Sequence, residues 1–168
     1  RRARVVPGDM ATPPSLDAPF GFAFNPWNSL RHLPDDRSLL AHLDATAASL
    51  APGGVYAVGV SLSSPDGDPH EEDVWQATRG RCRVLQLLNF EPLEGRVERA
   101  HAQFMIHRGE REEYLTTSYD LRTYTADQWR RILGRSSRRR IASLDLRGRD
   151  RAGRDLPYQL DILTHSEG

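Results

Sequence analysis

The 168-residue sequence contains no lysine, and all 23 of its basic residues are arginine. This absence excludes reactions that need a lysine amine, such as Schiff-base formation, a lysine general base or phosphate binding by a P-loop lysine. Acidic residues also number 23, so the formal net charge is zero. Because nucleic-acid and acidic-membrane binders normally carry a basic excess, the balance argues against both kinds of partner.

Cysteine is almost absent, since Cys82 is the only one. It has no second cysteine with which to form an intramolecular disulfide or a cysteine-based zinc site. The residues around it are typical of a strand, and we interpret Cys82 as a plain strand residue. The sequence also lacks an apolar run of membrane-spanning length and a secretory signal. Together these absences favour a reducing cytoplasm as the location.

The first third of the sequence alternates between strand and helix signals, which predicts a parallel α/β sheet. Strands are predicted over residues 3–6, 20–25 and 55–62, the last two as buried apolar runs. Pro34-Asp35-Asp36 suits the first turn of a helix, and residues 51–54 end it. Its apolar residues at helical spacing are Leu39, Leu40, Leu43, Ala47 and Leu50.

The middle third changes character. A turn-rich loop over residues 63–69 is followed by extended segments at 81–90, 96–107 and 112–122, with turns between them. Side chains alternate between the two faces along the second segment, and one face is more polar. We therefore predict a three-stranded antiparallel meander.

The last third returns to α/β signals. Thr125 is a predicted N-cap for a helix over residues 126–133, and strands are predicted at 141–146 and 158–163. The arginine run at 138–140 is interpreted as an exposed turn. His70-Glu71-Glu72-Asp73 is interpreted as a solvated acidic loop, and we predict no metal site.

The order of elements from Val5 to Leu62 resembles the second half of the class I S-adenosylmethionine-dependent methyltransferase core. The resemblance rests on Val5-Val6-Pro7-Gly8-Asp9-Met10, the strand at 20–25, the helix, Leu50-Ala51-Pro52-Gly53-Gly54 and the strand at 55–62. The loop Asn28-Ser29-Leu30-Arg31-His32-Leu33-Pro34-Asp35 is similar to that of glycine and sarcosine N-methyltransferases.

The resemblance implies a Rossmann-like α/β sheet that lacks its first strands, with an inserted antiparallel three-strand lid. Residues 1–62 would form a partial cofactor-binding core and 63–122 the lid. Residues 123–168 would supply the last helix and the closing strand pair. The implied cofactor is S-adenosylmethionine, and the implied activity is methyl transfer to a small-molecule acceptor.

The resemblance also implies roles for residues near the carboxyl ends of the strands, where open α/β sheets bind ligands. Asp9 and Met10 would hold the adenine, and Asn25, Pro26 and Trp27 would line the cofactor site. Asn28 and His32, the latter the only histidine that the sequence places near this loop, are the catalytic candidates. Each has a structural alternative: a turn carboxylate or amide, a strand end, a core aromatic, or a histidine that bonds the backbone.

The sequence departs from the family in three respects, of which the mildest is Gly21, where the family usually has an acidic residue after the aromatic. It has no glycine-rich turn after a first strand, so we expect it to be a fragment that lacks upstream strands. Trp27 stands where the related loop has glycine, which argues against glycine or sarcosine as the acceptor. The alternative function is a degenerate methyltransferase fold that acts as a binding or scaffold subunit. The acceptor atom and the oligomeric state are left open.

Overall fold

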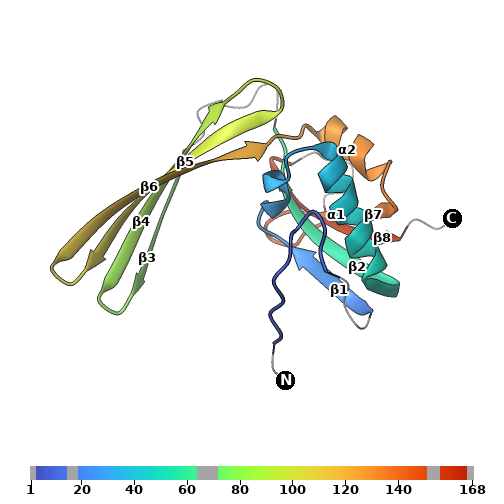
Figure 1. Ribbon diagram of the computed structural model, residues 1–168, viewed down its shortest axis with the longest axis horizontal. Coiled ribbons are helices and arrows are strands. Elements are labelled where there is room, and N and C mark those ends of the chain that lie inside the picture. Colours follow the sequence, from blue (N-terminus) through green and yellow to red (C-terminus); the bar gives the residue numbers. More distant parts are fainter. Residues whose placement is uncertain (1–2, 15–18, 64–71, 151–155, 166–168) are drawn as a thin grey trace. The chain divides into compact units, whose positions relative to one another are not determined.

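The computed structural model describes residues 3–14, 19–63, 72–150 and 156–165. The chain divides into two compact units, each described below by itself. The core unit comprises residues 1–64 and 123–168, and the hairpin unit comprises residues 65–122. Figure 1 labels the elements of both units. No helix in the described part of the chain is long and apolar enough to cross a membrane.

The core unit contains a four-stranded mixed sheet in the order β1-β2-β8-β7. Strand β1 pairs in parallel with β2, whereas β2 with β8 and β8 with β7 are antiparallel. The predicted α/β class is therefore confirmed. The strands are β1 (Phe20–Asn25), β2 (Leu50–Ser61), β7 (Arg138–Leu144) and β8 (Tyr158–His165).

The helices of the core unit begin where the sequence predicts. The 13-residue α1 (Asp36–Ala48) has Asp35 as its N-cap, whose carboxylate accepts a hydrogen bond from the Ser38 amide. The shorter α2 (Ala126–Leu133) begins at Thr125 in a capping box completed by Gln128. These side chains satisfy amides that a helix end would otherwise leave unpaired. A short 3-10 turn, η1 (Ser29–His32), precedes α1.

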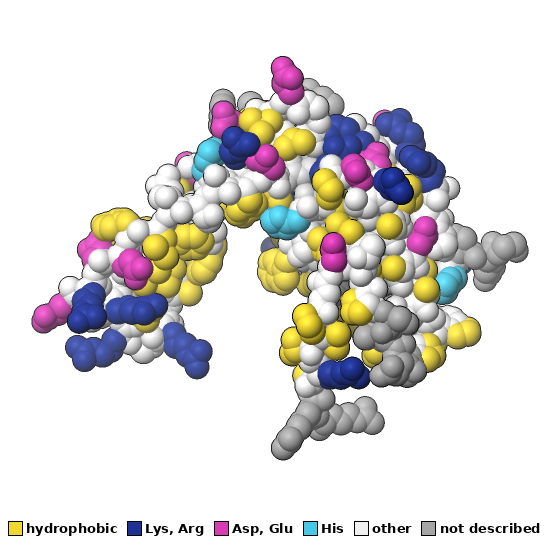
Figure 2. All heavy atoms as spheres, viewed as in Figure 1, with side chains coloured by type: hydrophobic (Ala, Val, Ile, Leu, Met, Phe, Trp, Pro, Cys, Tyr) yellow, Lys and Arg dark blue, Asp and Glu magenta, His cyan; other side chains and the backbone are white. Residues whose placement is uncertain are grey.

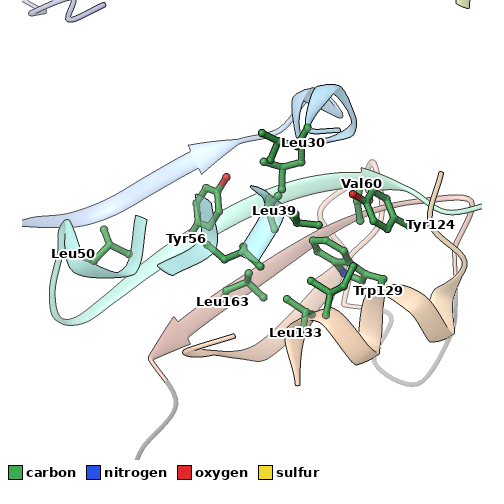
Figure 3. Close-up of a cluster of buried hydrophobic side chains, with 13 residues drawn as sticks. Leu30, Leu39, Leu50, Tyr56, Val60, Tyr124, Trp129, Leu133 and Leu163 are labelled. Carbon is green, nitrogen blue, oxygen red and sulfur yellow. The ribbon is translucent and has the colours of Figure 1, made fainter. Parts of the chain in front are cut away.

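Both helices cover the same face of the sheet. His42 of α1 bonds to Tyr56 of β2, and Trp129 of α2 bonds to Asp161 of β8, the residue paired with Val58. Tyr56 and Val58 lie two residues apart, so they share a face. Figure 3 shows the buried side chains of this face, which form the core. They are Leu30, Leu33, Leu39, Leu43, Leu50, Tyr56, Val58, Val60, Tyr124, Trp129, Ile132, Leu133 and Leu163.

A buried carboxylate under α2 ties this helix to two strands. Asp161 is 0% exposed and accepts hydrogen bonds from Trp129 Nε1 at 2.7 Å and Ser143 Oγ at 2.7 Å. Gln159 Nε2 donates to both carboxylate oxygens, and Arg140 approaches to 3.4 Å. A buried carboxylate is tolerated when its oxygens are hydrogen-bonded and its charge is paired, and this one is.

The hairpin unit is a four-stranded antiparallel sheet in the order β3-β4-β5-β6. The predicted segments correspond to β4 (Cys82–Pro92), β5 (Val97–Arg108) and β6 (Arg111–Arg122). The prediction of three strands was wrong, because β3 (Glu72–Arg79) adds a fourth. All eight residues of β3 are exposed, so no apolar run marks it, and Glu72 and Asp73 belong to this strand. His70 and Glu71 lie outside the described residues.

The two faces of the hairpin unit differ in polarity, as the alternation along β5 predicts. The strand register places Trp75, Leu88, Phe104 and Leu115 on one face. Polar side chains, among them His101, share the other face with a smaller apolar group. Trp75 and Leu115 are exposed, and Figure 2 shows hydrophobic side chains on the surface of this unit.

Two predictions for the first third were wrong. Residues 3–6 form no strand, and a β-branched run alone does not make one without a partner to complete its hydrogen bonds. Strand β1 is present but is not buried on both faces. It lies at the edge of the described sheet, and Phe22 and Phe24 stack on its open face with Phe24 68% exposed.

The boundaries of two further strands also differ from the prediction. Strand β2 begins at Leu50 rather than at residue 55, so Leu50 belongs to the strand and not to α1. The Pro-Gly-Gly turn instead forms an irregularity opposite Gly21, where the register shifts. Strand β7 begins at Arg138, so the arginine run is not an exposed turn. Arg138 is buried, and Arg140 points at Asp161.

Candidate functional site

The carboxyl ends of the two parallel strands meet at one edge of the core sheet. Strand β1 ends at Asn25, opposite Val58, while β2 continues for three more residues to Ser61. A hollow of about 450 Å³ lies beside the end of β1. Residues from the 9–12 turn, β1, the following loop, α1 and β2 line it: Met10, Ala23, Phe24, Asn25, Pro26, Trp27, Ser29, His42, Thr46 and Tyr56. The structure thus brings together four of the five predicted cofactor residues.

Asn28 fixes the loop after β1 to the end of β2. Its Nδ2 donates to Ser61 Oγ at 2.7 Å, and its Oδ1 accepts from the Ser61 amide at 2.5 Å. Its backbone has φ of 59°, a left-handed conformation that asparagine adopts more readily than most residues. Both ends of the amide are therefore engaged within the chain. Its predicted role toward a substrate stays a prediction.

A second contact holds the same loop two residues earlier, at Pro26. The Tyr158 hydroxyl donates a hydrogen bond to the Pro26 carbonyl. Gly59 makes this possible, since a Cβ at that position would overlap both the Pro26 carbonyl and the Tyr158 hydroxyl. Burial raises the pKa of Tyr158, so it stays protonated as the donor.

Trp27 stands between these two anchors and is itself 83% exposed. Its indole is therefore not a core aromatic, which was the alternative to a site role. The backbone is held at Pro26 and at Asn28, on both sides of it. The loop presents a large amphipathic ring at the rim of the hollow.

His42 and Tyr56 form a buried hydrogen-bonded pair in the wall of the hollow. His42 Nδ1 lies 2.7 Å from the Met10 carbonyl, and Nε2 lies 2.9 Å from the Tyr56 hydroxyl. A carbonyl only accepts, so Nδ1 carries the proton and neutral Nε2 accepts from Tyr56. Burial lowers the pKa of His42, although the Met10 bond opposes the shift. Burial also raises the pKa of Tyr56. A hydrogen bond with Asn25 and the charge of Arg138 both lower it, but burial has the larger effect.

The turn at residues 9–12 contributes the remaining polar group. Asp9 is exposed, and its Oδ1 accepts from the Ala11 amide at 2.8 Å, as expected of a turn carboxylate. The other oxygen has no hydrogen-bond partner among the described residues. Met10 places its side chain in the hollow, with Sδ 3.7 Å from Asn25 Nδ2. The turn can both cap itself and present a carboxylate to a ligand.

The structure brings a second histidine to the site. His32 lies exposed at the end of η1 and does not line the hollow, so it is not the only histidine near the site, and its catalytic role stays a prediction. His42 lines it instead. It falls three residues after Leu39 and beside Leu43 in the apolar stripe of α1, and a polar residue in such a stripe was the available signal. Tyr56, Ser29 and Thr46 were also missed.

The hollow fits a nucleoside cofactor in size and chemistry. Small-molecule sites typically measure about 300–1,000 Å³ and combine apolar walls with a few polar groups. Here the side chains of Met10 and Ala23 supply apolar surface, while Asn25, Ser29 and Thr46 supply polar groups. No group of three or more potential metal ligands occurs among the described residues.

Replacing Gly59 by alanine should displace the Pro26 loop, because the new Cβ overlaps a backbone carbonyl that is fixed in place. We expect the free energy of unfolding to fall by about 1–3 kcal/mol, the usual cost of overpacking. Gly21→Ala is the matched control, since nothing lies within 4 Å of a Cβ there. Urea unfolding of both variants checks this, and equal stabilities would contradict the steric account.

Replacing His42 by glutamine should make stability less dependent on pH. The folded-state pKa of His42 lies below its ordinary value of 6.5, so its contribution is complete above that value and is lost as pH falls below it. The Tm difference between wild type and His42→Gln should therefore narrow from about pH 7.5 to about pH 5.5. Tyr56→Phe keeps the titrating ring and should retain the wild-type slope. A constant difference would show that His42 is not buried as a neutral ring.

Comparison with known proteins places this arrangement in a recognised fold. The sequence matches no protein-family profile and no curated protein. Among solved structures, an S-adenosylmethionine-dependent methyltransferase from Clostridium acetobutylicum superimposes with a TM-score of 0.80 at 12% identity. The match covers 99% of this chain and 66% of that one.

Two further structures agree. A sugar N-methyltransferase from Streptoalloteichus has a TM-score of 0.72 at 19% identity, with 95% of this chain and 61% of that chain covered. An amino pentose methyltransferase from Micromonospora echinaspora, solved with S-adenosylmethionine bound, has a TM-score of 0.71 at 18% identity, with 95% and 63% covered. The chain spans less than two thirds of the length of these proteins. It has the fold of class I S-adenosylmethionine-dependent methyltransferases.

Proposed function

We propose that the chain is part of a methyltransferase that uses S-adenosylmethionine to methylate a small molecule. The observation that carries the proposal is the hollow at the carboxyl end of β1. Its wall combines Met10 of one turn with Asn25, Pro26 and Trp27 of another segment. Open α/β sheets bind their ligands at this edge, and the solved methyltransferases share the fold.

Residues in and next to the hollow would hold different parts of the cofactor. The second carboxylate oxygen of Asp9 would accept a hydrogen bond from the adenine amino group, and the Met10 side chain would pack on the adenine ring. Asn25 and Pro26 would lie along the cofactor beside the sheet. When bound, S-adenosylmethionine supplies a methyl group on a positively charged sulfur. It would supply this methyl group to a lone pair of the acceptor by displacement from the sulfur.

The protein's contribution to such a displacement is to position the acceptor and keep water out. The anchored loop suits this task, because Pro26 and Asn28 fix the backbone on both sides of Trp27. We assign the Trp27 indole to one wall of the methyl-transfer site, with Asn28 and His32 as the catalytic candidates of the loop. The catalytic assignment has less support at His32, because this residue is exposed and lies outside the hollow.

The acceptor is proposed to be larger than glycine. An exposed indole at the rim favours a ring with one apolar face, which can lie flat on it. The related enzymes from Streptoalloteichus and Micromonospora echinaspora act on sugars that carry amines. We propose a small cyclic acceptor of this general kind. We also propose that the hairpin unit acts as a lid and that the protein is cytoplasmic.

The full-length gene product should bind S-adenosylmethionine with a micromolar Kd, measured by isothermal titration calorimetry. Asp9→Asn should weaken binding by about tenfold or more, because it keeps the Ala11 cap but loses a charged acceptor. Asp120→Asn on the hairpin unit, where the carboxylate pairs with Arg99, is the matched control. No binding by the full-length protein would refute the proposal and favour a scaffold subunit.

A further inference from the structure

His42 is the buried polar side chain that links the most separate parts of the site. It lies on α1, accepts a hydrogen bond from Tyr56 of β2, and donates one to the Met10 carbonyl. Helix α1 and strand β2 contribute buried residues to the core, whereas the turn at residues 9–12 belongs to no strand or helix and only packs Met10 and Ala11 against that core. The histidine therefore joins the core of the unit to the turn that faces the hollow.

The other hydrogen bonds of this turn do not fix its place on the sheet. The Ala11 amide and the Thr12 amide both bond back to Asp9, at 2.8 and 3.2 Å, and so stay within the turn. The contact from Asn25 Nδ2 reaches only the Met10 thioether, a weak acceptor, at 3.7 Å. The 2.7 Å bond from His42 is the short one that anchors the turn's backbone.

Tyr56 satisfies the other nitrogen of the ring. A neutral imidazole has one donor and one acceptor, and either nitrogen can carry the proton. Because the Met10 carbonyl can only accept, the proton is on Nδ1, and the Tyr56 hydroxyl donates to the remaining acceptor, Nε2. The charge of the buried Arg138 guanidinium acts on Tyr56 as well. The pair is thus built so that His42 presents a donor to the turn.

We propose that His42 is a positioning residue for cofactor binding, with Tyr56 as the partner that bonds its second nitrogen and holds the ring in place. It holds the Met10 carbonyl so that the Met10 side chain remains in the hollow and Asp9 remains next to it in the turn. His42 itself does no chemistry on the methyl group. This inference rests on the proposed cofactor site and adds to it a residue that acts through the turn.

Two substitutions at position 42 separate the two bonds. In His42→Asn the amide nitrogen occupies nearly the place of Nδ1 and can still donate to Met10, while the Tyr56 contact is lost. In His42→Gln the amide reaches the place of Nε2 near Tyr56, and the Met10 contact is lost. We expect the Kd for S-adenosylmethionine, measured by calorimetry on the full-length protein, to rise about tenfold in His42→Gln and less than about threefold in His42→Asn.

Ser143→Ala is the matched control, because it removes a buried 2.7 Å hydrogen bond to Asp161, away from the hollow. It should lower Tm as the position-42 variants do and leave the Kd unchanged. If His42→Gln does not fold, Tyr56→Phe replaces it, with an expected rise in Kd of about threefold.

Equal Kd values for His42→Asn and His42→Gln would overturn the inference, as would a wild-type Kd in His42→Gln, or in Tyr56→Phe where that variant replaces it. These results are distinct from failure of the proposed function. In that case the wild-type protein itself would bind no S-adenosylmethionine, and the positioning role would fall with it.

Discussion

The parallel pairing of β1 with β2 is the constraint on which the site depends. Parallel strands end at the same edge of a sheet, so the register that sets Asn25 opposite Val58 also decides where the next loop begins. Because β2 extends to Ser61, the loop after β1 has a strand end beside it to which it can attach. The Asn28–Ser61 bonds and the Tyr158–Pro26 bond both use this overhang. Small side chains are then required where the loop crosses β2, and Gly59 meets that need.

Both helices pack on one face of the sheet, and α1 contributes His42 to the wall of the hollow. The burial of Leu39 and Leu43 orients α1, which brings His42 over Tyr56 and toward the 9–12 turn. The Asp161 network fixes α2 to β7 and β8 by similar means. Two hydrogen-bonded groups, one around Asp161 and one around His42, thus fix the helices to the sheet. Trp27 is an exposed aromatic on a fixed backbone, which supports our proposal that it forms one wall of the acceptor site.

The sequence predicted those parts that follow from local rules. The helix start at Pro34-Asp35-Asp36, the N-cap at Thr125 and the antiparallel β4–β6 meander were confirmed, because such residues, periodicity and turns are local signals. Strand β3 escaped prediction because its pairing with β4, not its own composition, makes it a strand. His42 escaped because its role depends on Met10, 32 residues away in the chain. Arg138 was misplaced because the alternation along β7 buries Arg138 and leaves Arg139 exposed, and a register shift between Arg140 and Ala142 leaves Ile141 exposed. Such outcomes depend on tertiary contacts.

The central claim is that the hollow beside β1 is the cofactor site. The three tryptophans of the chain provide separate reporters: Trp27 at the hollow, Trp75 on β3 and Trp129 on the buried face of α2. The most direct measurement is a titration of the full-length protein with S-adenosylhomocysteine, followed by the indole N–H signals in NMR spectra. The signal that disappears in the Trp27→Phe variant belongs to Trp27. The account predicts a saturable shift of this signal, while the Trp129 signal stays nearly unchanged. Saturable binding that leaves the Trp27 signal in place would contradict it.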